Sequence, residues 1–197
     1  MYILGVTGSI GSGKSTASAR LADLGAVVSH SDNLAKEILQ DNKEILAALS
    51  DRFGSDILDN SGTLQRHILA ERAFASREDQ LFLNHSIHPE VKKITLMRIE
   101  TARAANKPMF VIDAPLLFEA HVDSITDSVL VIAADRIFRQ GRVGKRSQIS
   151  TQDFERREAL QMPIEEKIRR AQHVIYNDGS LDELQEKVDL LYSELIH

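Results

Sequence analysis

The stretch GSIGSGKST, residues 8–16, decides the fold class of this chain. It follows an apolar run typical of a buried strand, YILGVT (2–7), and leads into residues 15–24, whose apolar spacing predicts a helix. The pattern G-x-x-x-x-G-K-[S/T] is met by Gly8, Gly13, Lys14 and Ser15. A strand, this loop and a helix in succession predict a backbone cradle for a phosphate group at the helix N-terminus.

Two side chains of the loop indicate a nucleotide together with a metal ion. Lys14 is placed to reach the β- and γ-phosphates, and the Ser15 hydroxyl is placed to ligate Mg²⁺. The alternative is a glycine-rich turn that binds nothing, which would leave a lysine at a helix start unexplained. The loop alone does not separate kinases from switches, motors and transporters.

Composition narrows the class of protein. The chain has 197 residues, 43% of them hydrophobic, which is enough for one well-buried core with a small inserted lobe. It has no cysteine, which excludes disulfides and thiolate chemistry. A net charge of -5 argues against a dedicated nucleic-acid binder, and no apolar run is long enough for a membrane span. We therefore expect a soluble, cytoplasmic protein.

Apolar runs alternate with helical patterns along the rest of the chain. Further strands are predicted at 26–29, 108–114, 128–133 and 173–176. Helices are predicted at 32–40, 43–53, 65–74, 77–105 with a break at His88-Pro89, along 135–171, and at 181–196. Continuous apolar strands that alternate with helices imply a parallel sheet covered on both faces.

We therefore expect a single α/β domain. The helical tract between the second and third predicted strands is too long for a simple crossover, so it is predicted to form an inserted lobe.

Asp32 is the first candidate for chemistry outside the loop. It is predicted at the end of the second strand, at the edge where parallel sheets bind ligands. A carboxylate there can accept a proton from an attacking hydroxyl or hold a Mg²⁺-bound water. The alternative is that Asp32 caps the following helix. Beside the phosphate loop we favour catalysis, and the sequence lacks the motifs of a guanine-nucleotide switch.

A basic tract supplies the second candidate feature. Residues 136–157 contain seven Lys and Arg but only two acidic residues, Asp153 and Glu155. Arg146 and Arg157 flank SQISTQ and could point inward from a lid onto a transferring phosphoryl group. Arg136, Arg139 and Arg142, spaced by three, fit a solvated helix face at least as well.

Several stretches in order resemble the dephospho-CoA kinase family, from the N-terminus to about residue 190. They are GSIGSGKST, SHSD, DNSGTLQRHIL with ERAFA, LNHSIHPEV, APLLFEA (114–120), Lys145-Arg146, REALQMPIEEK (157–167) and VIYNDGSLDEL (174–184). The resemblance implies transfer of the γ-phosphoryl group of ATP to the ribose 3′-hydroxyl of dephospho-CoA, the last step of coenzyme A synthesis. It also implies an α/β protein with a single P-loop kinase domain. Its three-layer P-loop NTPase-like core with a parallel sheet would lie at about 1–32, 108–134 and 172–197, its inserted helical acceptor (substrate) lobe at about 33–107 and its lid at about 135–171.

The resemblance assigns roles to individual residues. Asp32 would be the base, Lys14 would stabilise the transferred group, and Arg146 would bind the phosphates from the lid. The residues that would hold ATP are Gly11, Ser12, Gly13, Lys14, Ser15, Thr16, Arg146 and Asn177, the last near the adenine. Ser15 and Asp32 would hold the metal. The residues that would bind the acceptor are Arg66, His88, Pro89, Leu116, Leu117, Phe118 and Glu119.

Three departures from the family pattern leave questions open. His30-Ser31-Asp32 stands where the family commonly has D-A-D, so His30 either pairs with a substrate phosphate or replaces an unneeded carboxylate. Ala133-Ala134-Asp135 and Tyr176-Asn177 also differ from the usual D-A-P and Asp-Asn. Asp113, at the end of the third strand, is either a carboxylate for Mg²⁺ or a solvent-facing strand end.

The resulting hypothesis is a kinase that uses ATP and Mg²⁺, acts on dephospho-CoA, contacts neither nucleic acid nor membrane, and is a monomer or a weak homo-oligomer. A kinase for another small nucleotide or hydroxyl acceptor is the alternative within the same class. A nucleotide-dependent switch that transfers no phosphate is the alternative from another class, and Asp32 with the basic lid argues against it.

Overall fold

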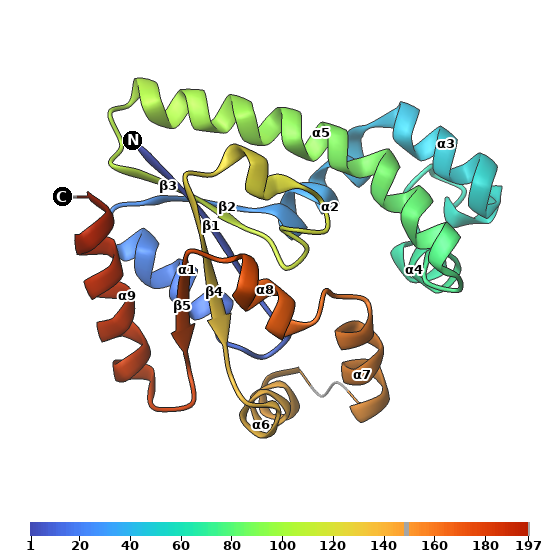
Figure 1. Cartoon of the computed structure of the whole chain (residues 1–197). Helices are drawn as coiled ribbons and strands as arrows, with labels where there is room; N and C mark the ends of the chain where they lie inside the picture. Colours follow the sequence, from blue (N-terminus) through green and yellow to red (C-terminus); the bar gives the residue numbers. More distant parts are fainter. Residues whose placement is uncertain (148–149, 197) are drawn as a thin grey trace. The chain divides into compact units, whose positions relative to one another are not determined.

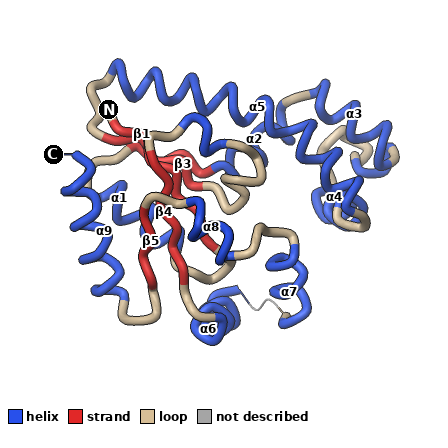
Figure 2. Tube along the Cα trace, viewed as in Figure 1, coloured by secondary structure: helices blue, strands red, loops and turns tan. Residues whose placement is uncertain are grey.

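The five strands lie side by side in one sheet. The computed structural model describes residues 1–147 and 150–196, without the side chains of residues 145–147, 151 and 157. Within these residues the strands are β1 (Tyr2–Gly8), β2 (Val27–His30), β3 (Met109–Asp113), β4 (Ser128–Ala133) and β5 (His173–Tyr176). All neighbours pair in parallel, in the order β2-β3-β1-β4-β5 (Figures 1 and 2). The predicted parallel α/β sheet is confirmed.

Alternation along the strands distributes their side chains between two apolar clusters. Met109 and Val111 of β3 join α1 (Lys14–Asp23) and α9 (Leu181–Ile196) on one face. Phe110 and Ile112 join α8 (Ile164–Arg170) and the C-terminal part of α5 (Arg77–Ala104) on the other. Because successive strand residues point to opposite faces, both faces of the sheet need a helical layer. The result is the expected three-layer core.

The chain divides into two compact units. One contains Met1–His30 and Arg98–His197, and the other contains Ser31–Met97. The second unit is helical: α2 (Ser31–Asp41), α3 (Lys43–Phe53), the short helix η1 (Ser55–Ile57), α4 (Arg66–Ala73) and the first part of α5. Its own core includes Leu34, Leu49, Ile57, Leu69 and Ile87. The helical unit thus ends within α5, earlier than the expected boundary at residue 107.

The predicted break at His88-Pro89 is wrong. Helix α5 continues through Pro89 to Ala104. Proline removes one N–H from the helical hydrogen-bond ladder, which normally kinks or ends a helix. Here Leu83, Ile87 and Val91 keep one apolar stripe across the proline and pack into the core of the helical unit. Tertiary packing therefore overrides the local signal.

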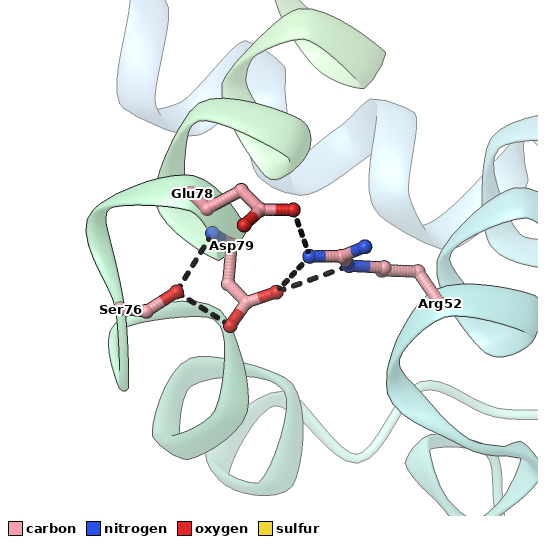
Figure 3. Close-up of polar contacts among 4 residues, drawn as sticks. All are labelled: Arg52, Ser76, Glu78 and Asp79. Carbon is pink, nitrogen blue, oxygen red and sulfur yellow. Dashed lines mark hydrogen bonds and ion pairs between the residues drawn. The ribbon is translucent and has the colours of Figure 1, made fainter.

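Polar contacts fix the start of α5 inside the helical unit (Figure 3). Ser76 Oγ accepts the Asp79 N–H at 3.1 Å and donates to the Asp79 carboxylate at 2.7 Å. Arg52 of α3 donates to Asp79 at 2.8 Å and to Glu78 at 2.9 Å. The Ser76 hydroxyl, and then the Arg52 guanidinium, hold the pKa of Asp79 below its ordinary value. These contacts join α3 to the first turn of α5.

The unit that contains the sheet, called the sheet unit below, also contains the basic tract of residues 136–157. The short helix η2 (Val122–Ile125) precedes β4, and α6 (Arg136–Ser147), α7 (Thr151–Ala159) and α8 follow it. The predicted helical character of 135–171 is therefore confirmed over its described parts. None of the described helices has the length and apolar character that a membrane crossing requires.

Candidate functional site

The phosphate loop joins the central strand β1 to helix α1. Gly11 and Gly13 have φ values of 78° and 99°, in the left-handed region that side chains disfavour. A Cβ at Gly11 would lie 2.6 Å from the Arg139 carbonyl oxygen, and a Cβ at Gly13 would overlap the Asn177 amide. The loop is closed by the Ser12 N–H, which donates to Ser9 O at 3.1 Å. Both glycines are therefore required by the fold of the loop.

The loop also contains a polar atom without a protein partner. Among the described residues, the Ser12 hydroxyl is buried and has no hydrogen-bond partner. The α1 N-terminus adds the positive end of a helix dipole, and Ser15 in its first turn is exposed. Backbone N–H groups, an orphaned hydroxyl and a lysine in one turn suit an anionic phosphate. The loop residues thus fit the group that the sequence predicted.

Lys14 at the start of α1 and His30 at the end of β2 both contact Asp113, the last residue of β3. Lys14 Nζ pairs with Asp113 Oδ1, and His30 Nδ1 lies 2.8 Å from Asp113 Oδ2. The Asp113 side chain is 2% exposed, Lys14 is 16% exposed and His30 is 45% exposed. Of the two alternatives for Asp113, the solvent-facing strand end is therefore wrong. The sequence predicted Asp113 at the end of a strand but did not predict its contacts with Lys14 and His30.

Asn177 braces the phosphate loop from the last strand. Its Nδ2 donates to Ser12 O at 2.7 Å, and its N–H donates to Ala133 O at 2.8 Å. Arg142 of α6 donates to Asn177 O at 2.8 Å. The contact with adenine that the resemblance implies for Asn177 stays a prediction, and so do the phosphate contacts of Thr16, which is half-buried in α1.

Arg139 is buried, although a solvated helix face fitted its sequence spacing at least as well as a role in the lid. Its side chain is 7% exposed, pairs with Glu158 of α7 at 2.6 Å and donates to Ala134 O at 3.0 Å. The guanidinium also stacks on the Phe154 ring, 5.6 Å from its centre. A period of three along α6 gave no sign of this, because the acidic partner lies on the next helix. Arg146 belongs to α6, but its side chain lies outside the described residues.

The segment after β3 is held by a buried lysine. Lys167 of α8 is fully buried, donates to Pro115 O at 2.5 Å and lies 3.1 Å from Glu119 Oε1. Burial lowers the pKa of Lys167, and the Glu119 carboxylate opposes that change. Glu119 Oε1 also accepts the Met162 N–H at 2.6 Å. Lys167 is the last residue of the stretch REALQMPIEEK (157–167), from which no role for it was predicted.

The predicted acceptor residues of this segment have different surroundings. Leu117 and Phe118 are buried in an apolar cluster beside the sheet, and Arg170 lies over the Phe118 ring at 4.5 Å. Leu116 is half-buried, and Glu119 is bonded as described above. A side chain buried in the core offers no surface to a ligand in this conformation. The predicted contacts of all four residues with the acceptor stay predictions.

The other predicted site residues belong to the helical unit. Asp32 is exposed in the first turn of α2, a position inside the helix and not at its cap. Arg66 begins α4, is exposed and donates to Lys36 O at 3.4 Å. His88 is half-buried on α5 beside the exposed Pro89, and burial lowers the pKa of His88. Their predicted roles are not tested by these positions.

The described residues hold no group of three or more His, Cys, Asp or Glu side chains that could bind a metal ion by themselves. Mg²⁺ usually takes one or two protein oxygens together with phosphate oxygens and water. The exposed Ser15 hydroxyl in the first turn of α1 suits that mode of binding.

The fold and the loop together define the class of protein. A glycine loop that leads from the central strand of a parallel sheet to a helix, with Lys14 and Ser15 at the helix start, is the mark of a P-loop nucleotide-binding protein. The family model described as dephospho-CoA kinase matches residues 2–183. The chain belongs to the dephospho-CoA kinase family, whose activity is the phosphorylation of dephospho-CoA to coenzyme A.

Individual relatives agree with this placement. A dephospho-CoA kinase of Syntrophotalea carbinolica is 36% identical over 196 residues, covering 100% of this chain and 93% of its own length. A solved structure from Thermus thermophilus is similar with a TM-score of 0.84 and 34% identity, covering 100% of this chain and 98% of that one. The structure of a dephospho-CoA kinase from Campylobacter jejuni is similar with a TM-score of 0.73 and 27% identity, covering 98% of this chain and 96% of that one.

Proposed function

We propose that the chain transfers the γ-phosphoryl group of MgATP to the ribose 3′-hydroxyl of dephospho-CoA, producing ADP and coenzyme A. The observation that supports this most directly is the phosphate loop, with two left-handed glycines, an orphaned Ser12 hydroxyl and Lys14 at the start of α1. The membership of the chain in the dephospho-CoA kinase family supports the choice of acceptor.

The residues of the loop bind and orient the nucleotide. Backbone N–H groups of residues 11 and 13–15 and the Ser12 hydroxyl donate to phosphate oxygens, and Lys14 leaves Asp113 to contact the transferred group. Ser15 and Asp32 are the proposed protein oxygens around Mg²⁺, and Asp113 is a further carboxylate at the same sheet edge as Lys14. When bound, Mg²⁺ neutralises phosphate charge that would otherwise repel the attacking oxygen.

Asp32 acts as the base in this proposal. Its carboxylate accepts the proton of the 3′-hydroxyl while that oxygen forms a bond to the γ-phosphorus. The bond from the γ-phosphorus to the bridging oxygen breaks, and its electrons leave with ADP. Arg146 is proposed to stabilise the transferring group from the lid, and Asn177 to border the adenine. Arg66, His88, Pro89 and residues 116–119 are proposed to hold the acceptor.

The test of the reaction is ADP production from MgATP with dephospho-CoA, run beside AMP, CMP, adenosine and no acceptor. We expect turnover with dephospho-CoA alone, and a product with its new phosphate on the 3′-oxygen, seen by phosphorus NMR. Turnover with another acceptor would establish a different small-molecule kinase. Nucleotide binding without transfer to any acceptor would instead establish a binding or switch protein.

Asp32→Asn tests the proposed base. Because general base catalysis contributes about a hundredfold or more to rate, kcat should fall by about that factor. The dissociation constant for MgATP should change much less than kcat, because the loop makes most of the phosphate contacts and asparagine keeps one oxygen at the proposed metal position. Asp51→Asn, at an exposed carboxylate on α3 of the same unit, is the matched control. Retained turnover in Asp32→Asn would rule out this role.

The predicted cytoplasmic location and monomeric or weakly oligomeric state remain predictions.

A further inference from the structure

The Asp113 carboxylate has two partners, Lys14, which under the proposed function binds the nucleotide, and His30, which has no such role. Lys14 contacts Oδ1 and His30 contacts Oδ2. His30 and Asp113 are direct neighbours in the register of β2 and β3, at the last residue of each strand. Strand pairing therefore sets this contact, and no flexible loop has to form it.

The chemistry of the pair fixes which atom carries the proton. A carboxylate that is ion-paired to a lysine only accepts hydrogen bonds. The His30 Nδ1 atom must therefore carry a hydrogen and donate it to Asp113 Oδ2 across 2.8 Å. The His30 ring is 45% exposed, so it lies between the buried carboxylate and solvent.

Nucleotide binding changes the balance around Asp113. Under the proposed function, Lys14 turns to the phosphates, and the carboxylate loses its charged partner. The Asp113 side chain is 2% exposed, and among the contacts described for it only the His30 hydrogen bond would remain. A buried carboxylate without a donor is costly, and it would pull Lys14 back from the phosphates.

We propose that His30 is a positioning residue that holds Asp113 in place while Lys14 is engaged with the nucleotide. This inference rests on the proposed function, because it requires Lys14 to leave Asp113 for a phosphate. His30 contributes a hydrogen-bond donor at one defined point, the Nδ1 position, and its effect on transfer passes through Asp113 and Lys14. The side chain needs no contact with either substrate.

The position of the donor gives a sharp set of variants. His30→Asn keeps an N–H near the place of Nδ1, whereas His30→Gln puts its N–H near the place of Nε2. His30→Ala removes the donor. His67→Ala, at an exposed histidine on α4 of the other unit, is the matched control.

The measurements are the dissociation constant for MgATP by calorimetry, the kinetic constants, and unfolding by urea without nucleotide. Because a hydrogen bond to a charged group is involved, His30→Ala and His30→Gln should weaken MgATP binding by about tenfold. His30→Asn should stay within about threefold of the parent. Stability without nucleotide should change little, since the Lys14 pair remains.

Two results would overturn the inference: unchanged MgATP affinity in His30→Ala, or an equal loss in His30→Asn and His30→Ala. Nitrogen-15 NMR of the His30 ring tests the contact without nucleotide. The Nδ1-protonated form should dominate in the parent and be lost in Asp113→Ala. A parent that shows this form but binds no MgATP would refute the proposed function while the His30–Asp113 contact stands. Absence of the form would refute the contact itself.

Discussion

At the scale of single residues, the conformation of the phosphate loop depends on two glycines that have no side chain. Gly13 lies at φ 99° against the Asn177 amide, and Gly11 lies against the backbone of α6. The missing side chains let the loop sit between α6 and the end of β5. Its shape is therefore set by its neighbours as much as by its own sequence.

Gly13→Ala should abolish nucleotide binding while leaving most of the fold intact. A methyl group there meets Asn177 and a backbone angle that alanine disfavours, so the loop must move away from Asn177 and lose the hydrogen bond from Asn177 Nδ2 to Ser12 O. Calorimetry with MgATP should show a loss of at least about a hundredfold in affinity, equivalent to about 3 kcal/mol.

Gly141→Ala is the control for that variant, because a Cβ at this helical glycine on α6 meets open space. Alanine in a helix interior is favoured by up to about 1 kcal/mol over glycine, so stability should hold or rise. Equal losses of nucleotide affinity in the two variants would contradict the account of Gly13.

Residue identities were easier to predict than their contacts. The loop spacing identified Lys14 and Ser15, since the motif is local in sequence. The burial of Arg139 and the pairing of Asp113 with His30 depend on which strands and helices become neighbours. A basic residue at every third position gives the same pattern whether the side chain faces solvent or pairs with an acidic residue on a neighbouring helix, so the sequence could not decide the surroundings of Arg139.

At the scale of elements, the apolar runs predicted the strands correctly, whereas Pro89 did not predict a helix end. Each predicted strand exists, because strands of a parallel sheet that is covered on both faces are buried on both sides and therefore consist of continuous apolar runs. Helix α5 shows the reverse case, since Pro89 predicted a break that the apolar stripe on either side overrides. Single-residue signals compete with burial summed over several turns.

His88 on α5 should make the helical unit sensitive to acid. Burial lowers the pKa of His88 below its ordinary value of 6.5, and the neighbouring His85 acts in the same direction. The unfolded chain then binds a proton more readily than the folded one, so stability is full above pH 6.5 and falls as the pH drops through the lower, folded-state pKa.

Urea unfolding followed by circular dichroism at pH 7.5 and pH 5.0 measures this effect. His88→Gln, which cannot titrate, should lose less stability between the two values than the parent. His67→Gln, at the exposed histidine on α4, should follow the parent. A parent and a His88→Gln variant with the same acid loss would show that other groups cause it.

At the scale of the whole molecule, the two units should respond to different ligands. Under the proposed function, a non-hydrolysable MgATP analogue contacts the loop, and dephospho-CoA contacts Arg66, His88 and Pro89. Hydrogen exchange by mass spectrometry should show the analogue slowing exchange in residues 8–16 and 136–144, and dephospho-CoA slowing it within 31–97. Protection of the sheet unit alone by dephospho-CoA would remove the helical unit from the acceptor site.

The sheet order has a consequence for how the chain is made. Strand β3 pairs with both β1 and β2, yet it follows them after the entire helical unit. During synthesis on the ribosome, β1 and β2 emerge with no strand to pair with, while residues 31–97 already carry their own apolar core. The Ser12–Asn177 bond joins residues 165 positions apart. The loop that is translated first is therefore among the last parts to acquire its final shape.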